Sequence, residues 1–248
     1  MGTPVVLITG ALTGIGRAAA RAFARDGHRT VVAGRHEEAG QKLVTELRAL
    51  GTEAEFFRTD VRHEDEVRNL VDRTVARFGR LDVAVNNAGT EGQPGPVTQQ
   101  TADTYTATFD TNVLGTLLSM KHELRVMQAQ GSGSIVNISS TYGHEGGAGA
   151  SVYVASKHAV EGMTKSAALE AAHFGVRVNA VAPGPTETAM LTRFTGTPER
   201  KAALATGVPL GRVAEPEEIA HAIVFLASDK TSFVTGQVLT ADGGKTAG

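Results

Sequence analysis

Residues 5–24 read V-V-L-I-T-G-A-L-T-G-I-G-R-A-A-A-R-A-F-A, which is a short hydrophobic run, a turn that contains three glycines and an alanine-rich segment. The run Val5–Ile8 is predicted to be a buried strand, and the alanine-rich segment is predicted to be a helix that ends near Arg25. A strand followed by a helix is the repeating unit of a parallel sheet. The fold class then depends on whether the rest of the chain repeats this unit.

The alternation of strand and helix continues along the chain. Further strands are predicted at residues 30–33, 54–57, 81–85, from 134, 176–181 and 237–240, with helices that include residues about 102–127, 152–173 and 216–227. The pattern predicts one α/β domain over residues 1–248, a doubly wound Rossmann domain whose seven-stranded parallel sheet has helices on both faces. The least regular stretch, about residues 184–211, is expected to be a mobile lid near the mouth of the site.

Composition restricts the class of protein. The 248 residues are 41% hydrophobic and 20% charged, which allows a large core. A net charge of −2 gives no broad electrostatic footprint for nucleic acid or for an anionic membrane. The early apolar run is far too short for a signal peptide or a membrane span, so a cytoplasmic location is expected. The chain has no cysteine and its eight histidines show no metal-ligand spacing, so no metal is expected.

Three glycines, Gly10, Gly14 and Gly16, lie in the first strand-to-helix turn. Glycine lets the backbone turn tightly and approach a pyrophosphate, whose negative charge is favoured at a helix N-terminus. The turn therefore indicates a dinucleotide site, and its place between a clear strand and a clear helix is the context that such a site requires. The alternative is a tight turn without a ligand.

Tyr153 and Lys157 lie four residues apart on one face of the predicted helix 152–173. A neighbouring cation favours phenolate, so we expect Lys157 to lower the pKa of Tyr153 toward the range useful for acid/base catalysis. Ser140 follows the strand that begins at residue 134 and could donate to a carbonyl oxygen as that oxygen gains negative charge. Ser139 competes with Ser140 for this role. The alternative is an ordinary boundary pair on the helix and a serine that closes a turn.

Several motifs along the whole chain resemble the short-chain dehydrogenase/reductase family, in its compact single-domain branch. They are T-G-A-L-T-G-I-G at residues 9–16, Asp60 with Val61, N-N-A-G at 86–89, N-V-L-G at 112–115, Ser140, Tyr153, Lys157, P-G-P-T-E-T at 183–188 and D-G-G at 242–244. Their number and order make the resemblance specific.

The resemblance implies an oxidoreductase that interconverts a ketone and a secondary alcohol by hydride transfer with a nicotinamide cofactor. Tyr153 would be the general acid/base, and Lys157 would lower its pKa and hold the nicotinamide ribose. Ser140 would orient the substrate oxygen; the spacing to Tyr153 in family members favours it over Ser139. Asn112 would help to hold a water that relays protons.

The resemblance also implies the contacts of the cofactor. Asp60 and Val61 would flank the adenine, Asn86 and the backbone through Gly89 would lie on the adenosine side, and Thr188 would meet the carboxamide. The residues expected to bind the cofactor are Gly10, Thr13, Gly14, Ile15, Gly16, Arg35, Asp60, Val61, Asn87, Ala88, Gly89, Tyr153, Lys157, Pro183, Gly184, Thr186 and Thr188.

The end of the second strand predicts which cofactor is preferred. A carboxylate there would bind both ribose hydroxyls of NAD and repel a 2′-phosphate, but this chain has Gly34, followed by Arg35. An arginine offers a planar set of donors to phosphate, so NADP(H) is expected to be preferred, with NAD(H) possible. Thr13 stands where many NADP-binding relatives carry a second basic residue, which argues the other way. The alternative for Arg35 is a solvated surface charge.

The sequence gives less information about the substrate and the oligomeric state. Thr90, Glu91, Tyr142, His144 and Glu145 follow the carboxyl edge of the sheet and are candidate substrate-pocket residues. Two carboxylates near the mouth speak against acidic substrates and for neutral ketones or cyclic alcohols. The family resemblance implies a dimer or tetramer through the two long central helices, and a homotetramer is expected. Two alternatives remain open, a regulator that senses a dinucleotide and a dehydratase or epimerase on the same fold.

Overall fold

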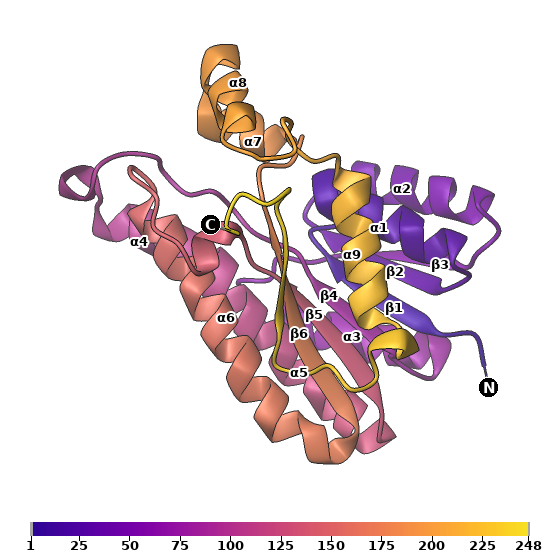
Figure 1. The fold of residues 1–248 in the computed structure, drawn as a ribbon. Coiled ribbons are helices and arrows are strands. Elements are labelled where there is room, and N and C mark those ends of the chain that lie inside the picture. The colour runs from indigo at the N-terminus through magenta and orange to yellow at the C-terminus, as the bar shows by residue number, and fades with distance from the viewer. Residues whose placement is uncertain (1, 248) are drawn as a thin grey trace.

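A computed structural model describes residues 2–247 and contains one seven-stranded sheet, in which every pair of neighbouring strands is parallel (Figure 1). The strand order is β3-β2-β1-β4-β5-β6-β7. The strands are β1 (Val5–Thr9), β2 (Arg29–Gly34), β3 (Ala54–Arg58), β4 (Val83–Asn86), β5 (Gly133–Ile138), β6 (Val176–Pro183) and β7 (Val238–Ala241). The predicted fold class is confirmed.

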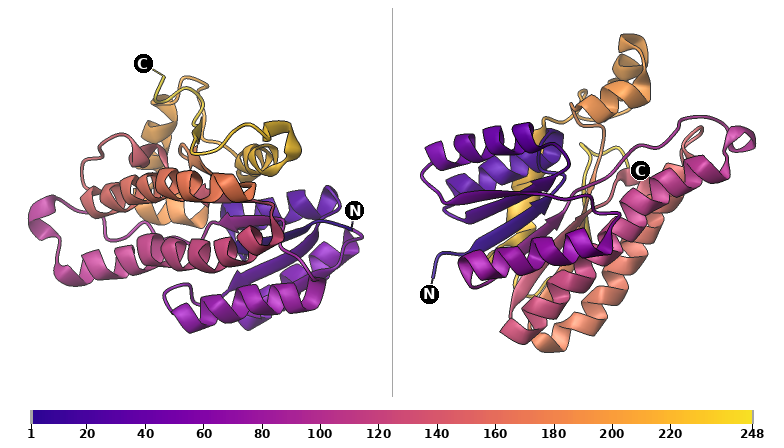
Figure 2. Two further views of the ribbon diagram at one scale, coloured as in Figure 1. Left: turned by 90° about the horizontal axis from the view of Figure 1, so that it is seen from below. Right: turned by 180° about the vertical axis from the view of Figure 1, so that it is seen from behind.

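Helices cover both faces of this sheet (Figures 1 and 2). They are α1 (Gly14–Arg25), α2 (Glu37–Ala49), α3 (Glu64–Phe78), α4 (Ala102–Phe109), α5 (Gly115–Gln130), α6 (Ser151–Ala171), α7 (Ala189–Thr195), α8 (Pro198–Thr206) and α9 (Pro216–Ala227). Successive residues of a strand point to opposite faces, so β1 contributes to two cores. Val6 and Ile8 pack with α1, α2 and α9, whereas Val5 and Leu7 pack with α3, α5 and α6.

The strand order reverses between β1 and β4. β1 pairs with β2 on one side and with β4 on the other, and the chain winds outward from there in both directions. In an open parallel sheet such a reversal leaves a crevice beyond the carboxyl ends of the two strands, because the loops after them turn away from each other. The first glycine turn follows β1, so the fold places it in this crevice.

The predicted helical region 102–127 is present as an unbroken run of helical residues, but it is not α-helical throughout. α4 and α5 are joined by a π-helical segment, Asp110–Leu114. Such a segment inserts an extra residue into a helical turn and is frequent at functional sites, and it has no reliable sequence signal. By contrast, α9 begins and ends where it was predicted, and its start is marked by Pro216 in the first turn.

The segment 184–211 is more regular than expected. It contains α7 and α8, which stand beyond the carboxyl edge of the sheet (Figure 1). The Thr188 hydroxyl caps α7 by accepting a hydrogen bond from the backbone of Leu191, and the Thr197 hydroxyl caps α8 in the same way. The prediction of an irregular stretch is therefore wrong, because Thr188 and Thr197 are helix caps. Its mobility as a lid stays a prediction.

Within residues 2–247, no helix has both the length and the apolar character needed to cross a membrane.

Candidate active site

Two adjoining hollows lie at the carboxyl edge of the sheet. A long crevice of about 800 Å³ runs over the ends of β1, β2 and β4. A smaller cavity of about 160 Å³ lies between the end of β5, α6 and α7. The residues that line both hollows are Ile15, Asn87, Gly89, Thr188 and Met190. A ligand in the crevice and a ligand in the cavity would therefore meet at this common wall.

The inner end of the crevice is built from backbone. Gly10 and Gly14 have positive φ angles of 62° and 51°, which other residues rarely adopt. A Cβ atom on Gly10 would lie 2.7 Å from the Cα of Ala88, and one on Gly16 would lie 2.4 Å from the Nδ2 of Asn87. The turn therefore leaves the backbone exposed to the crevice and packs tightly behind it. Thr13 is the N-cap residue of α1.

The N-N-A-G segment holds that turn in place. Asn87 donates from Nδ2 to the carbonyl oxygens of Thr9 at 3.2 Å and Gly10 at 2.9 Å. Asn86 lies in the sheet instead, where its Nδ2 atom donates to Glu123 and Asn137. The expectation that Asn86 lies on the adenosine side is therefore wrong for its side chain, which is buried between strand and helix.

The outer end of the crevice carries the charged groups. Asp60, Val61 and Arg35 line it, as predicted from the sequence, together with Arg62, which the sequence reading missed. Arg62 donates to both carboxylate oxygens of Asp60, and this hydrogen bonding lowers the pKa of that carboxyl to about 2. Leu12 covers Gly34: a Cβ atom on Gly34 would lie 2.7 Å from the Cδ1 of Leu12. A carboxylate side chain at residue 34 would require Leu12 to move.

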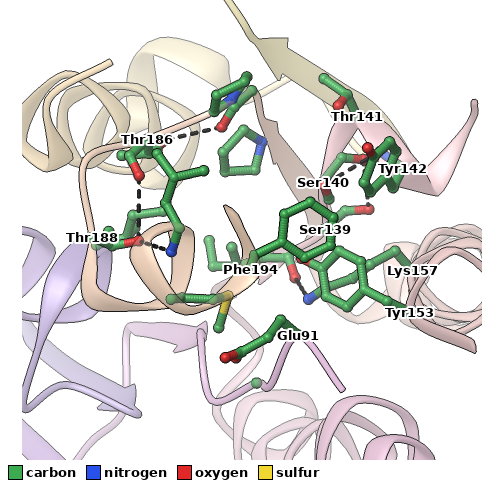
Figure 3. Close-up of a pocket in the computed structure, with 18 of the residues that line it drawn as sticks. Glu91, Ser139, Ser140, Thr141, Tyr142, Tyr153, Lys157, Thr186, Thr188 and Phe194 are labelled. Atoms are coloured by element: carbon green, nitrogen blue, oxygen red, sulfur yellow. Dashed lines mark hydrogen bonds between the residues drawn. The ribbon is translucent and has the colours of Figure 1, made fainter. Parts of the chain in front are cut away.

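Ser140, Tyr153 and Lys157 line the smaller cavity together (Figure 3). Ser140 follows β5 and caps a short 3-10 turn, Thr141–Gly143, through a 3.3 Å hydrogen bond from the Tyr142 backbone. Tyr153 and Lys157 lie one turn apart near the start of α6, and the Lys157 Nζ atom is 5.7 Å from the centre of the Tyr153 ring. Ser139 also lines the cavity, but its hydroxyl donates to Glu161 at 2.8 Å.

Burial dominates the acid/base properties of this pair. It raises the pKa of Tyr153 to about 12, and the Ser140 hydroxyl counteracts only part of the rise. Burial also lowers the pKa of Lys157 to about 8, against the opposing charge of Glu161. The expected lowering of the Tyr153 pKa by Lys157 is not found in this structure, because desolvation by burial is the largest influence on the pKa of each group and neither group is among the influences on the other. The Lys157 Nζ atom donates 2.8 Å to the carbonyl of Ile138.

Asn112 lies in the π-helical segment and is almost fully buried. Its Nδ2 atom donates to the Thr90 carbonyl at 2.9 Å and to the Ser156 hydroxyl at 3.0 Å, while its Oδ1 atom accepts from the Thr90 backbone at 2.8 Å. The side chain therefore ties the loop after β4 to α6. Its role in holding a water stays a prediction.

The remaining predicted cofactor residues line the smaller cavity. Pro183, Gly184 and Thr186 line the smaller cavity, and Thr188 lines both. The Thr188 Cγ2 atom would lie 3.0 Å from a Cβ on Gly14, so the cap of α7 packs directly on the first glycine turn. A Cβ on Gly184 would lie 2.7 Å from the Cα of Asp242, which explains why glycine stands there.

Apolar groups form the substrate side of the small cavity. Tyr142 and Phe194 face each other with ring centres 6.3 Å apart, and Met190, Leu191 and Leu204 complete the wall. Thr90 lines the crevice instead, and His144 lies against Glu161. These contacts were not evident from the sequence, because α7 and α8 bring residues from far along the chain to the cavity.

The two carboxylates at the mouth are both neutralised. Glu91 pairs with Arg193 of α7, with 2.5 Å between Oε1 and Nε, and Glu145 pairs with Lys245. The argument that these carboxylates disfavour acidic substrates is therefore wrong, because a paired carboxylate exerts little net field on a neighbouring ligand.

The crevice fits a nicotinamide dinucleotide. The exposed backbone of the glycine turn at the start of α1 suits a pyrophosphate, Asp60 and Val61 line the far end, and the near end opens toward Tyr153. In the part of the chain that the structure describes, there is no cluster of three or more histidine, aspartate or glutamate side chains able to hold a metal ion.

Comparison with known proteins identifies the family. A family model described as enoyl-(acyl carrier protein) reductase matches residues 10–246. The chain is 45% identical to cis-4-hydroxycyclohexanecarboxylate dehydrogenase of Sinomonas cyclohexanicum over 98% of this chain and 96% of that one. It is 38% identical to cyclohexanol dehydrogenase of Acinetobacter sp. (strain SE19), over 98% and 94% of the two chains.

A solved structure agrees with these relatives. A variant of actinorhodin polyketide ketoreductase, crystallised with NADPH, superimposes with a TM-score of 0.94 at 37% identity, over 98% of this chain and 97% of that one. The chain belongs to the short-chain dehydrogenase/reductase family. It is an NAD(P)-dependent oxidoreductase that interconverts secondary alcohols and ketones.

Proposed function

We propose that Tyr153 is the general acid/base of this oxidoreductase, that Ser140 assists it, and that Lys157 would hold the nicotinamide ribose. The observation that carries the proposal is that these side chains, from the loop after β5 and from α6, meet in one cavity that shares a wall with the dinucleotide crevice. A bound nicotinamide would exchange a hydride with the substrate carbon. The Tyr153 hydroxyl gives its proton to the carbonyl oxygen in reduction and takes it back in oxidation. Ser140 donates a hydrogen bond to the same oxygen as it gains negative charge.

We propose that the substrate is a secondary alcohol or ketone on a six-membered ring. An apolar cavity of about 150 Å³ is large enough to hold a benzene ring, and the cavity here measures about 160 Å³. Tyr142, Phe194 and Leu204 give its walls the apolar character that a ring prefers. The names of two relatives, which act on cyclohexanol and on hydroxycyclohexanecarboxylate, support the same class.

A substrate panel tests this proposal. The ratio kcat/KM should be at least about tenfold higher for cyclohexanol than for the open-chain alcohol hexan-2-ol, because the flexible chain fills the same walls less well. Because Glu91 and Glu145 are both paired, cis-4-hydroxycyclohexanecarboxylate should also be accepted. Equal kcat/KM for the ring and the open chain would contradict the assignment of the cavity to a ring.

We also propose a preference for NADP(H). Arg35 lines the outer end of the crevice and is exposed, so its guanidinium is accessible to a ligand phosphate. Leu12 packs over Gly34, so a ribose-binding carboxylate side chain at residue 34 would require Leu12 to move. The actinorhodin polyketide ketoreductase variant, which was crystallised with NADPH, supports this choice of cofactor. Fluorescence titration of the protein with NADPH and NADH should give at least about tenfold tighter binding of NADPH.

We propose that the protein is a homotetramer. Helices α5 and α6 expose Leu117, which is 48% accessible, and Leu169, which is 82% accessible. Exposed leucines on long helices suit packing against a second copy about a twofold axis. Light scattering should give about four times the 25.8 kDa of one chain, and a mass of 25.8 kDa at micromolar concentration would contradict the proposal. The cytoplasmic location stays a prediction.

A further inference from the structure

A buried carboxylate lies beneath the catalytic serine. Glu161 stands on α6, one helical turn beyond Lys157, and only 7% of its side chain is exposed. A buried charge is costly unless hydrogen bonds and a countercharge compensate it. Both are present, because Glu161 accepts hydrogen bonds from the loop after β5 and its charge acts on Lys157.

The hydrogen bonds of Glu161 reach both ends of the Ser140 turn. Its Oε1 atom accepts from the Ser139 hydroxyl at 2.8 Å, and the Nδ1 atom of His144 lies 3.1 Å from the same oxygen. Ser139 immediately precedes Ser140, and His144 ends the 3-10 turn that Ser140 caps. One carboxylate oxygen therefore holds the chain before and after the serine that faces the cavity.

The residues around the Glu161 Oε1 atom are tightly packed. A Cβ atom on Gly143 would lie 2.1 Å from the Glu161 Oε1 atom and 2.4 Å from the Ser139 Oγ atom. The 3-10 turn therefore rests directly on the carboxylate. A change of charge or hydrogen bonding at Glu161 would be transmitted to the turn, because no intervening space could absorb it.

We propose that Glu161 is a positioning residue that fixes the Ser140 hydroxyl for hydrogen bonding to the substrate oxygen. It acts through Ser139 and His144 and does not itself line the cavity. The inference rests on the role of Ser140 in the proposed function. A displacement of about 1 Å at a group that stabilises a transition state is enough to cost a large part of its effect.

A double-mutant cycle tests the proposal. Glu161→Gln keeps the size of the side chain and an acceptor oxygen but removes the charge. In the otherwise unchanged protein it should lower kcat at least about tenfold. In the Ser140→Ala background it should lower kcat less than about threefold, because the group that it positions is then missing. Glu170→Gln is the matched control, since Glu170 is an exposed carboxylate on the same helix, and it should keep the original kcat.

The outcomes separate this inference from the proposed function. If Glu161→Gln keeps the original kcat, or loses the same factor in both backgrounds, the positioning role is wrong while Ser140 keeps its own. If Ser140→Ala alone keeps the original kcat, the role of Ser140 in the proposed function is wrong and the positioning role fails with it. If Glu161→Gln does not fold, Ser139→Ala replaces it in the cycle, because it removes only the hydroxyl that Glu161 accepts from, and its two values of kcat are interpreted in the same way.

Discussion

The dinucleotide crevice and the substrate cavity adjoin each other but are built differently. At its inner end the crevice consists of backbone, with Gly10 and Gly14 at positive φ and Asn87 bonded to the carbonyls of the turn. The cavity consists of side chains, and Phe194 and Leu204 come from helices that stand beyond the sheet. At the glycine turn a larger side chain would clash with the backbone, so few substitutions are tolerated there. In the apolar wall of the cavity, single side chains can be exchanged while the backbone stays in place. We therefore expect changes in the crevice to affect every substrate and changes in the cavity to affect the choice of substrate.

The largest effect is expected at the proposed general acid/base, which lines the cavity but acts on every substrate. Tyr153→Phe keeps the packing of the ring and removes the proton, so kcat should fall by roughly two to four orders of magnitude for every substrate. The melting temperature and the affinity for the cofactor should remain close to those of the unmodified protein. Steady-state kinetics measure kcat, and calorimetry measures the melting temperature and the affinity for the cofactor. More than about a tenth of the original kcat would contradict the role of Tyr153.

The pH dependence should differ between the two directions of reaction. Burial raises the pKa of Tyr153 to about 12, so the phenolate that oxidation requires is scarce at neutral pH. Its fraction grows about tenfold per pH unit below the pKa, and kcat for alcohol oxidation should rise from about pH 7 to about pH 10. Ketone reduction uses the protonated phenol and should not rise. Stopped-flow rates of both directions check this, and an oxidation rate independent of pH would contradict it.

At the outer end of the crevice, cofactor binding is expected to depend on a side chain, in contrast to the inner end, which is built from backbone. Arg35→Ala should weaken the binding of NADPH about ten- to a hundredfold and leave that of NADH almost unchanged, because only NADPH carries the phosphate. Arg25→Ala, at an exposed position at the end of α1, is the control. Equal losses for the two cofactors would show that Arg35 does not contact the phosphate.

Reversal of the preference should need two changes. Gly34→Asp was expected from the sequence to favour NADH, but the new Cβ atom would lie 2.7 Å from Leu12. The single change should therefore weaken both cofactors through a steric clash. Leu12→Ala combined with Gly34→Asp removes the clash and should favour NADH. Titration of both variants with both cofactors decides whether Leu12 has this effect.

The backbone at the inner end should resist even one methyl group. Gly16→Ala places a Cβ atom 2.4 Å from the Asn87 Nδ2 atom and 2.5 Å from the Gly10 carbonyl oxygen. The turn would have to shift, at a cost of about 1–3 kcal/mol, and both cofactors should bind about tenfold more weakly. Gly146→Ala is the control, since among residues 2–247 no heavy atom beyond its chain neighbours lies within 4 Å of its added Cβ. Unchanged binding in Gly16→Ala would contradict the tight packing behind the turn.

The smallest effect should come from the cavity wall. Phe194→Ala removes an aromatic ring opposite Tyr142 and should raise the KM for cyclohexanol about fivefold, which corresponds to roughly 1 kcal/mol of lost apolar contact. The affinity for the cofactor should change less than twofold. Phe225→Ala, which changes a half-exposed ring on α9, serves as the control. A parallel loss of cofactor affinity would contradict the division between the two regions.

The sequence by itself determined the alternation of strands and helices and the place of the glycine turn. These features are local, because a strand, a helix or a positive φ angle depends on a few neighbouring residues. The same is true of Tyr153 and Lys157, which share a helix face through their spacing alone. The resemblance to the family, carried by ordered motifs from Thr9 to Gly244, followed from the sequence as well.

Only the tertiary structure decided how deeply these residues are buried and which distant residues they contact. Burial is the largest influence on the pKa of both Tyr153 and Lys157, and burial depends on the packing of the whole domain. Arg193 and Lys245 neutralise Glu91 and Glu145 from 102 and 100 residues away in the sequence. Glu161 meets Ser139 and His144 only because α6 packs against the end of β5. Contacts between residues far apart in the chain have no local signal, since they form only when the sheet brings their elements together.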